Sequence, residues 1–371
     1  MRIGFDVAQT CIERAGCAWY ADSLVRALVQ VAPDNEYFLY HQFGRWINQD
    51  TAHGTFIEHP SVQMPFFGMG PDESRSSWSG SGTLTKLTGD PDIVQSNSFQ
   101  AISTAGAKLV FVIYDTSFWT YPQFTTEANR LNCQQGVLEA LERADGFLFI
   151  SESGRTEFET LFPGWLERNG KPAAAIPLAS RLQPSQTVEA TQPYWLAVGS
   201  MEPRKNYDAI FAALDRYWLE SKKPCPLWIA AAAGWKNEKI GKRANDLEAQ
   251  GRIRVLGYVD EKRLATLYQQ ALSLIFPSWY EGFGLPVLEA MQSGCPVICS
   301  DRTSLPEVAG DTALYIDPAE PESICRAMIR LEEDPSLRRQ CRESGLDRAK
   351  NFSWNRTAEA TLSFYREVLK S

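Results

Sequence analysis

Histidine is scarce in this sequence. Only three histidines, at positions 41, 53 and 59, occur among its 371 residues, and the eight cysteines form no C-x-x-C pair and follow no regular spacing. Zinc sites are built from clustered cysteine and histidine ligands, so this pattern argues against a metal centre. Unpatterned cysteines are typical of a protein whose thiols stay reduced, and we expect a cytoplasmic location.

An excess of positive charge is also lacking. The chain carries 37 basic and 45 acidic residues, which gives a net charge of −8. Residues 1–180 hold 12 basic and 20 acidic residues, whereas the remainder holds 25 of each. Because nucleic-acid binding depends on basic side chains that replace phosphate counterions, this balance argues against nucleic acid as a partner. Charge alone also disfavours docking of the first half onto anionic lipid.

Long apolar runs are absent as well. No stretch reaches the roughly 20 apolar residues that a membrane-spanning helix needs. The first residues, MRIGFDVAQTCIERAG, begin with a strand pattern and contain no charged-then-apolar leader. We therefore expect a soluble, intracellular protein.

Strand-like and helix-like segments alternate along the whole chain, which indicates parallel α/β sheets. A chain of this length exceeds one hydrophobic core. We predict two doubly wound, Rossmann-like domains that face a cleft, at 1–180 and 193–355, joined by a polar linker at 181–192. Ligands of such sheets bind beyond the carboxyl ends of the strands.

The segment 64–87 is rich in glycine and serine, with aromatic residues between them. A mobile loop at the acceptor site is the favoured interpretation. Peripheral contact with a membrane through Phe66, Phe67 and Trp78 is the alternative.

Two glutamates flank a glycine-rich turn in SWYEGFGLPVLEAM, residues 278–291. Pro286 suits the first turn of a helix, so we predict a helix that begins near Leu285. Uncovered N–H groups of the turn would then form an anion site. Glu289 would lie in the first helical turn or just beyond, where it could accept hydrogen bonds from a diol, whereas Glu281 would belong to the loop. One alternative is that the glutamates lie on a solvated surface. Another is that a glutamate only complements the helix dipole. The presence of both glutamates favours a ligand.

An adjacent pair of cations occurs in AVGSMEPRKNYDAIFAAL, residues 197–214. We predict that a strand ends at Gly199 and that Arg204 and Lys205 follow in a loop before a helix. Arginine and lysine at the carboxyl end of a strand suit a diphosphate. The alternative is a solvated basic pair.

Two further segments carry weaker signals. Gly16 precedes a helical pattern and would let the backbone approach a phosphate or sugar, although a simple turn glycine is an equal alternative. Tyr114 and Asp115 lie where a strand meets a loop, with aromatic residues nearby. Such a group suits a carbohydrate, but aromatic residues at strand ends also pack in cores.

Taken together, these motifs resemble the retaining glycosyltransferases of family 4, which have the two-domain GT-B fold. RAGCAWYADSL is similar to the glycine-rich first loop, GSMEPRKN to the phosphate-binding loop, EGFGLPVLE to the E-x7-E signature and SLPEVAGDTALYIDP to the segment that follows it. FSWNRTAEATLSFYREVL resembles the last helix, which in such enzymes returns to the first domain, so residues 356–371 are expected to complete it. The resemblance spans nearly the whole chain and is more specific in the second half.

The resemblance implies a reaction in which a hexose passes from a nucleotide-sugar donor, GDP- or UDP-linked, to an acceptor hydroxyl with retention of configuration. It also implies a role in donor binding for each matching residue. No metal or other cofactor is implied. Arg204 and Lys205 would hold the diphosphate, Glu281 would face the sugar and Glu289 the ribose. The remaining donor contacts would be Gly16, Tyr114, Val259 beside the base, and the amides of Phe283, Gly284 and Leu285. The implied catalytic set is Glu281, Asp115, Arg204 and Lys205.

One residue departs from the family pattern. Many members, mannosyltransferases in particular, have His-Asp where this chain has Tyr114-Asp115. A tyrosine can donate a hydrogen bond to a hydroxyl but cannot act as a cation. Because of this departure, the motif does not identify the transferred sugar. Mannose from GDP-mannose is favoured, and uridine-linked donors are the second choice.

The leading hypothesis is a metal-independent hexosyltransferase of polysaccharide or glycoconjugate assembly, with a carbohydrate or lipid-linked glycan as acceptor. A nucleotide-sugar epimerase of the same architecture is one alternative, although a second set of acid/base residues for it is lacking. A non-catalytic sugar-nucleotide-binding subunit is another, motivated by Tyr114.

Overall fold

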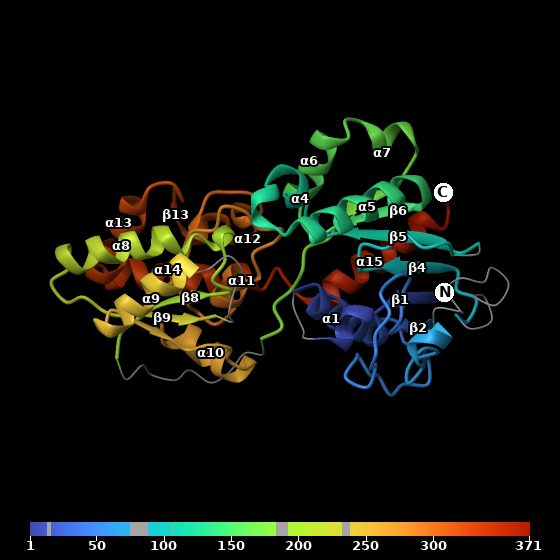
Figure 1. Cartoon of the computed structure of the whole chain (residues 1–371), viewed down its shortest axis with the longest axis horizontal. Coiled ribbons are helices and arrows are strands. Elements are labelled where there is room, and N and C mark those ends of the chain that lie inside the picture. The colour runs from blue at the N-terminus through green and yellow to red at the C-terminus, as the bar shows by residue number, and fades with distance from the viewer. Residues whose placement is uncertain (13–15, 75–87, 105, 183–191, 232–237) are drawn as a thin grey trace. The chain divides into compact units, whose positions relative to one another are not determined.

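The computed structural model describes the chain except for residues 13–15, 75–87, 105, 183–191 and 232–237. Its internal contacts divide the chain into two units, each with its own sheet (Figure 1). Unit 1 comprises Met1–Leu178 and Ser353–Ser371, and unit 2 comprises Ala179–Phe352. The sequence interpretation placed the boundaries at 180 and 355, with a linker from 181. The first residues of that linker, through Leu182, belong to unit 2.

Unit 1 is built on a seven-stranded parallel sheet in the order β3-β2-β1-β4-β5-β6-β7. From β1 the chain adds β2 and β3 on one side and then β4 to β7 on the other, so the strand order reverses between β1 and β4. The strands are β1 (Arg2–Asp6), β2 (Glu36–Tyr40), β3 (Val62–Gln63), β4 (Ile93–Ser96), β5 (Lys108–Ile113), β6 (Gly146–Phe149) and β7 (Ala173–Ala175). The helices are η1 (Ala8–Cys11), α1 (Gly16–Val31), α4 (Ser117–Thr120), η2 (Pro122–Phe124), α5 (Glu127–Arg143), α6 (Glu152–Leu161), α7 (Trp165–Arg168) and α15 (Trp354–Val368).

Alternate residues of the unit 1 strands face opposite layers of helices, as the period of a strand requires. On one face, Phe111 and Phe147 pack with Val137 and other apolar residues of α5. On the other face α1 and α15 lie side by side, and α15 covers Gly146 of β6. The carboxyl-terminal helix is therefore part of the core of unit 1.

Unit 2 repeats this plan with a six-stranded parallel sheet in the order β10-β9-β8-β11-β12-β13. The strand order reverses between β8 and β11. The strands are β8 (Trp195–Val198), β9 (Leu227–Ala230), β10 (Ile253–Val255), β11 (Leu274–Phe276), β12 (Val297–Ser300) and β13 (Leu314–Ile316). The helices are η3 (Pro203–Lys205), α8 (Tyr207–Glu220), α9 (Glu238–Ala249), α10 (Glu261–Gln270), α11 (Leu285–Gln292), α12 (Leu305–Ala309), η4 (Gly310–Thr312), α13 (Pro321–Glu333) and α14 (Pro335–Ala349).

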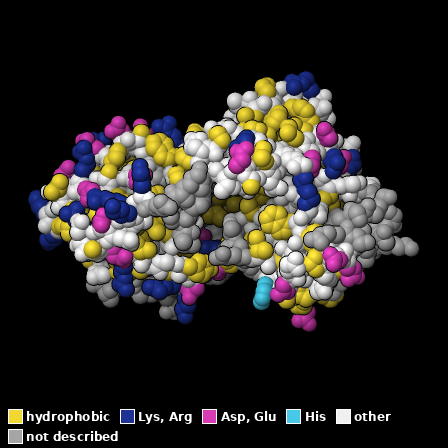
Figure 2. Space-filling view, viewed as in Figure 1, with side chains coloured by type: hydrophobic (Ala, Val, Ile, Leu, Met, Phe, Trp, Pro, Cys, Tyr) yellow, Lys and Arg dark blue, Asp and Glu magenta, His cyan; other side chains and the backbone are white. Residues whose placement is uncertain are grey.

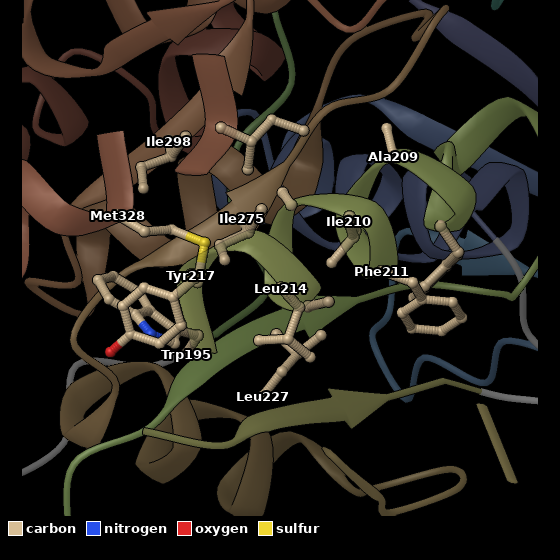
Figure 3. Close-up of a cluster of buried hydrophobic side chains, with 14 of the residues drawn as sticks. Trp195, Ala209, Ile210, Phe211, Leu214, Tyr217, Leu227, Ile275, Ile298 and Met328 are labelled. Carbon is tan, nitrogen blue, oxygen red and sulfur yellow. The ribbon is translucent and has the colours of Figure 1, made fainter. Parts of the chain in front are cut away.

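The core of unit 2 lies between this sheet and helices α8, α9 and α13. Trp195 and Leu227 of the sheet pack with Leu214 and Tyr217 of α8 and with Met328 of α13 (Figure 3). Helix α11 packs against α14 instead, and its buried residues do not belong to this cluster. The sheet thus has a layer of helices on each face, which leaves the carboxyl ends of its strands for a ligand.

Basic and acidic side chains are interspersed over unit 2 on the face that Figure 2 shows, in keeping with its balanced charge. None of the helices within the described residues is both long enough and apolar enough to cross a bilayer. Of the residues considered for membrane contact, Phe66 is fully buried, so that assignment is wrong for Phe66 because its ring packs in the core of unit 1. Phe67 is partly exposed, and Trp78 lies outside the described residues.

Candidate functional site

The predicted cation pair lies at the reversal point of the unit 2 sheet. Strand β8 ends at Val198, and Arg204 and Lys205 form the short helix η3 before α8 begins. The loop after the neighbouring strand, β11, contains Glu281. The backbone N–H of Trp279 in that loop donates to Arg204 O (2.9 Å), which ties the two loops together. A doubly wound sheet binds its ligands at this point.

Glu281 holds both cations. Its Oε2 accepts from Arg204 Nη1 at 2.7 Å, and its Oε1 accepts from Lys205 Nζ at 2.7 Å. Arg204 Nη1 also donates to Tyr280 O, and its Nη2 donates to Glu202 Oε1 (2.8 Å). The Glu281 side chain is 8% exposed and that of Lys205 is 10% exposed. The solvated-surface interpretations of this glutamate and this basic pair are therefore wrong.

The charges of the cluster shift its titration. Burial would raise the pKa of Glu281, but the positive charges of Arg204 and Lys205 outweigh burial and lower it to about 2. Burial lowers the pKa of Lys205, and the attraction of Glu281 only partly offsets this. The ammonium also lies 4.5 Å from the centre of the Phe276 ring, where a cation is favoured. Glu281 is thus a carboxylate at neutral pH that fixes two partly buried cations.

Helix α11 begins at Leu285, as the sequence predicted, with Gly284 as its N-cap and Pro286 in its first turn. Among the described residues, nothing accepts a hydrogen bond from the backbone N–H of Phe283, Gly284 or Leu285. Three N–H groups at a helix start that have no acceptor among the described residues attract an anion. The Phe283 ring is buried against Phe352, so the side chain of Phe283 is not available to a ligand.

Gly284 has the left-handed backbone conformation that favours glycine, with φ = 103°. A Cβ added there would lie 2.6 Å from Leu305 Cδ2. Gly284→Ala is expected to lower the free energy of unfolding of unit 2 by about 1–3 kcal/mol, measured by urea denaturation. Gly241→Ala in α9 is the matched control, because a Cβ there meets nothing within 4 Å. An equal effect of both substitutions would contradict the strain assigned to Gly284.

Glu289 lies one turn into α11, with a side chain that is 4% exposed. The first turn of α11 contains no acidic residue, so the helix-dipole explanation does not apply. Its Oε1 lies 3.3 Å from Arg181 Nε, and its Oε2 accepts from the Tyr268 hydroxyl at 3.1 Å. Burial raises its pKa, while Arg181 and Tyr268 act in the opposite direction. The predicted ribose contact of Glu289 stays a prediction.

Three residues that the sequence interpretation did not assign shape this site. Thr303 has φ = 50°, which is strained for a β-branched residue, and its hydroxyl accepts from the N–H of Glu281 (3.1 Å). Ser304 Oγ donates to Glu281 O (2.8 Å). Asn206 has φ = 58°, and its Nδ2 donates to Pro277 O and Pro318 O. These contacts fix the backbone on both sides of the ion cluster.

The remaining unit 2 prediction, Val259, lies in the loop between β10 and α10 and is partly buried. This loop follows the carboxyl end of the outermost strand, β10. The same helix, α10, provides Tyr268 to Glu289. Contact of Val259 with a base stays a prediction.

In unit 1, Gly16 is the first residue of α1, and a Cβ added there would meet no described atom within 4 Å. Asp115 follows β5, and its Oδ1 accepts from Ser117 N (2.9 Å) and Oγ (2.6 Å), which starts the short helix α4. Tyr114 is buried, and its hydroxyl donates to Asn97 O (2.9 Å). The one O–H of this phenol is therefore used within unit 1, whereas its oxygen can still accept a hydrogen bond. Contact of Tyr114 with the nucleotide-sugar stays a prediction.

A buried carboxylate at the reversal point of unit 1 was also missed. Asp6 ends β1, and it accepts from Ala8 N (3.0 Å), Asn97 N (3.0 Å) and Ser98 Oγ. Burial outweighs these hydrogen bonds and raises its pKa to about 6. Asp6 thereby joins the loops after β1 and β4. In the sequence, the signal that could have identified Asp6 is the presence of an aspartate in an otherwise apolar strand.

Two Rossmann-like units, whose strand orders match except for the additional strand β7 of unit 1, are typical of a GT-B protein. The solved structures similar to this chain share that fold. Sucrose-phosphate synthase from Thermosynechococcus elongatus superposes with a TM-score of 0.75 at 19% identity, covering 100% of this chain and 99% of that one. Anabaena Alr3699/HepE, solved in complex with UDP and glucose, gives a TM-score of 0.66 at 15% identity over 98% and 99% of the two chains. The expected GT-B fold is confirmed.

Residues 180–348 match the family described as "Glycosyl transferases group 1". The chain is 33% identical over 272 residues to O-antigen chain mannosyltransferase B of Escherichia coli, which covers 70% of each chain. The chain belongs to this glycosyltransferase family. The predicted resemblance to family 4 glycosyltransferases, mannosyltransferases among them, is confirmed.

Proposed function

We propose that this chain transfers a hexose, with mannose from GDP-mannose as the first candidate, to an acceptor hydroxyl of a growing polysaccharide, with retention and without a metal ion. The observation that carries the proposal is the ion cluster of Arg204, Lys205 and Glu281 in the same unit as the first N–H groups of α11, which have no described acceptor. The similarity to an O-antigen chain mannosyltransferase supports the sugar and the product class. The likeness to a protein solved with UDP and glucose keeps a uridine donor as the second candidate.

The proposed site matches the charge that the reaction develops. Transfer breaks the bond from C1 of the sugar to the diphosphate oxygen, so negative charge grows on that oxygen. Arg204, Lys205 and the first N–H groups of α11 would stabilise this charge, because they are fixed before the reaction begins. Glu281 offsets the cost of burying two cations and holds them in place.

Retention in a single step requires the acceptor to approach from the face that the diphosphate leaves. The acceptor oxygen then forms the new bond to C1, and its proton passes to the departing diphosphate oxygen. This scheme needs no separate base from the protein. Asp115 would contact the acceptor or the sugar.

The test is to incubate the protein with GDP-mannose, or with UDP-linked hexoses, and a mannose-terminated glycan acceptor, with and without EDTA. Release of nucleoside diphosphate with a new α-linkage by NMR, unchanged by EDTA, is the expected result. A β-linkage would overturn retention, and loss of turnover in EDTA would overturn metal independence. Interconversion of the free nucleotide-sugar would indicate the epimerase, and binding without turnover would indicate the non-catalytic subunit.

Lys205→Ala is expected to weaken binding of the nucleoside diphosphate about ten- to hundredfold, because a charge-assisted contact to phosphate is lost. Isothermal titration calorimetry measures the affinity, with circular dichroism to verify the fold. Lys222→Ala, an exposed lysine after α8, is the control. Unchanged affinity in Lys205→Ala would count against the diphosphate assignment.

A further inference from the structure

The first residues of unit 2 are held against α11. Arg181 Nε lies 3.3 Å from Glu289 Oε1, and Leu182 O accepts from Gln292 Nε2 at 3.0 Å. Glu289 and Gln292 are both on α11. Arg181 comes three residues after Leu178, where unit 1 ends. The segment that leaves unit 1 is therefore part of the surroundings of Glu289.

Within the described part of the chain, Arg181, Tyr268 and Glu261 act on the carboxylate of Glu289. Arg181 approaches Oε1 from the entering segment, and Tyr268 of α10 donates to Oε2. Glu261, in the first turn of α10, adds a like charge that acts to raise the pKa of Glu289. Arg181 is the positive charge that acts on Glu289 in the opposite direction.

A neutral carboxylic acid would serve the proposed ribose contact poorly. A carboxylate can accept hydrogen bonds from both hydroxyls of a diol, whereas its protonated form turns one acceptor into a donor. Burial favours the protonated form, and Glu289 is 3% exposed. The ribose contact therefore needs a neighbouring residue that keeps the Glu289 carboxylate charged and restricts its rotation.

We propose that Arg181 is a positioning residue for the nucleotide donor, which keeps Glu289 ionised and fixes its carboxylate for the ribose diol. This inference rests on the proposed function. Tyr268 fixes the second oxygen, so the two partners together determine the carboxylate plane. The donor pocket is thereby completed by the segment that enters unit 2, which the sequence interpretation had assigned to a linker.

The test compares a nucleotide with its analogue that lacks the diol. GDP and 2′,3′-dideoxy-GDP, with the corresponding UDP pair in parallel, are titrated by calorimetry from pH 6 to pH 9. In the wild type, the diol is expected to improve affinity about tenfold at every pH. In Arg181→Gln this advantage is expected to vanish at pH 6 and to recover towards pH 9, because Glu289 then ionises only at higher pH. Arg181→Lys, which keeps the charge, is expected to retain most of the advantage at pH 6.

The outcomes separate this inference from the proposed function. A full tenfold advantage in Arg181→Gln at pH 6 would overturn the inference, as would a loss that is the same at pH 6 and pH 9. Glu289→Gln should lose the advantage at every pH, and an unchanged advantage there would overturn the ribose contact itself. A wild-type protein that binds neither nucleotide pair would overturn the proposed function. Arg326→Gln on α13, an exposed arginine paired with Glu322, is the control for loss of one positive charge.

Discussion

Glu281→Gln is expected to reduce transferase activity by at least about a hundredfold and to lower the free energy of unfolding of unit 2 by about 3 kcal/mol at pH 7. Glutamine keeps the size of the side chain but removes the charge that Arg204 and Lys205 share. Arg204 would keep its ion pair with Glu202, but both partly buried cations would lose the carboxylate that contacts them. Removing one partner of a buried ion pair is costly because the other charge stays desolvated.

The dependence of this effect on pH follows from the titration of Glu281. Its pKa of about 2 lies below the ordinary value of 4.5, because the two cations outweigh burial. A depressed pKa contributes stability that is present above pH 4.5 and is lost as pH falls through about 2. The shift corresponds to about 3 kcal/mol, part of which the cost of burying the Lys205 ammonium offsets.

Urea unfolding of the wild type and of Glu281→Gln, at pH 7 and again near pH 3, measures this difference. The stability gap between the two proteins is expected to narrow at the lower pH. Glu322→Gln is the matched control, because its carboxylate pairs with Arg216 and Arg326 on the exposed surface of α13. Exposed pairs contribute about 1 kcal/mol or less. A gap that is independent of pH would contradict the role of Glu281 as the charged centre of the cluster.

The local features of this site could be predicted from the sequence. The proline after Gly-Phe-Gly-Leu fixed the expected start of α11, and the residues after Val198 predicted a loop that carries Arg204 and Lys205. Both predictions use short-range rules about glycine, proline and strand ends. The alternation of strands and helices likewise predicted two parallel sheets.

Long-range contacts could not be predicted in this way. Arg204 and Glu281 are 77 residues apart, and nothing in either segment shows that the carboxylate contacts the cations. The left-handed backbone of Thr303 has no sequence signal, because threonine rarely adopts it. The hydrogen bond from Tyr114 to Asn97 O is equally invisible in the sequence, because the loop after another strand supplies the acceptor.

Phe364→Ala is expected to lower the free energy of unfolding of unit 1 by about 3–5 kcal/mol. The Phe364 side chain is buried, although it belongs to the last helix of the chain. It covers Gly146 of β6, where an added Cβ would lie 3.0 Å from Phe364 Cζ and 2.6 Å from Val368 Cγ2. Helix and sheet are too close for another side chain to fill the cavity that alanine would leave, so the lost packing is not recovered.

Hydrogen exchange followed by mass spectrometry can assign the effect to one unit, which a single melting temperature cannot do for a two-domain protein. Faster exchange is expected in β5, β6 and α1, with protection of β8 and α8 unchanged. Ser363→Ala, at an exposed position of the same helix, is the control and should change stability by no more than about 0.5 kcal/mol. Faster exchange confined to α15 would show that the helix frays without the rest of unit 1. Because α15 packs against α1 and covers β6, we expect the whole unit to respond instead.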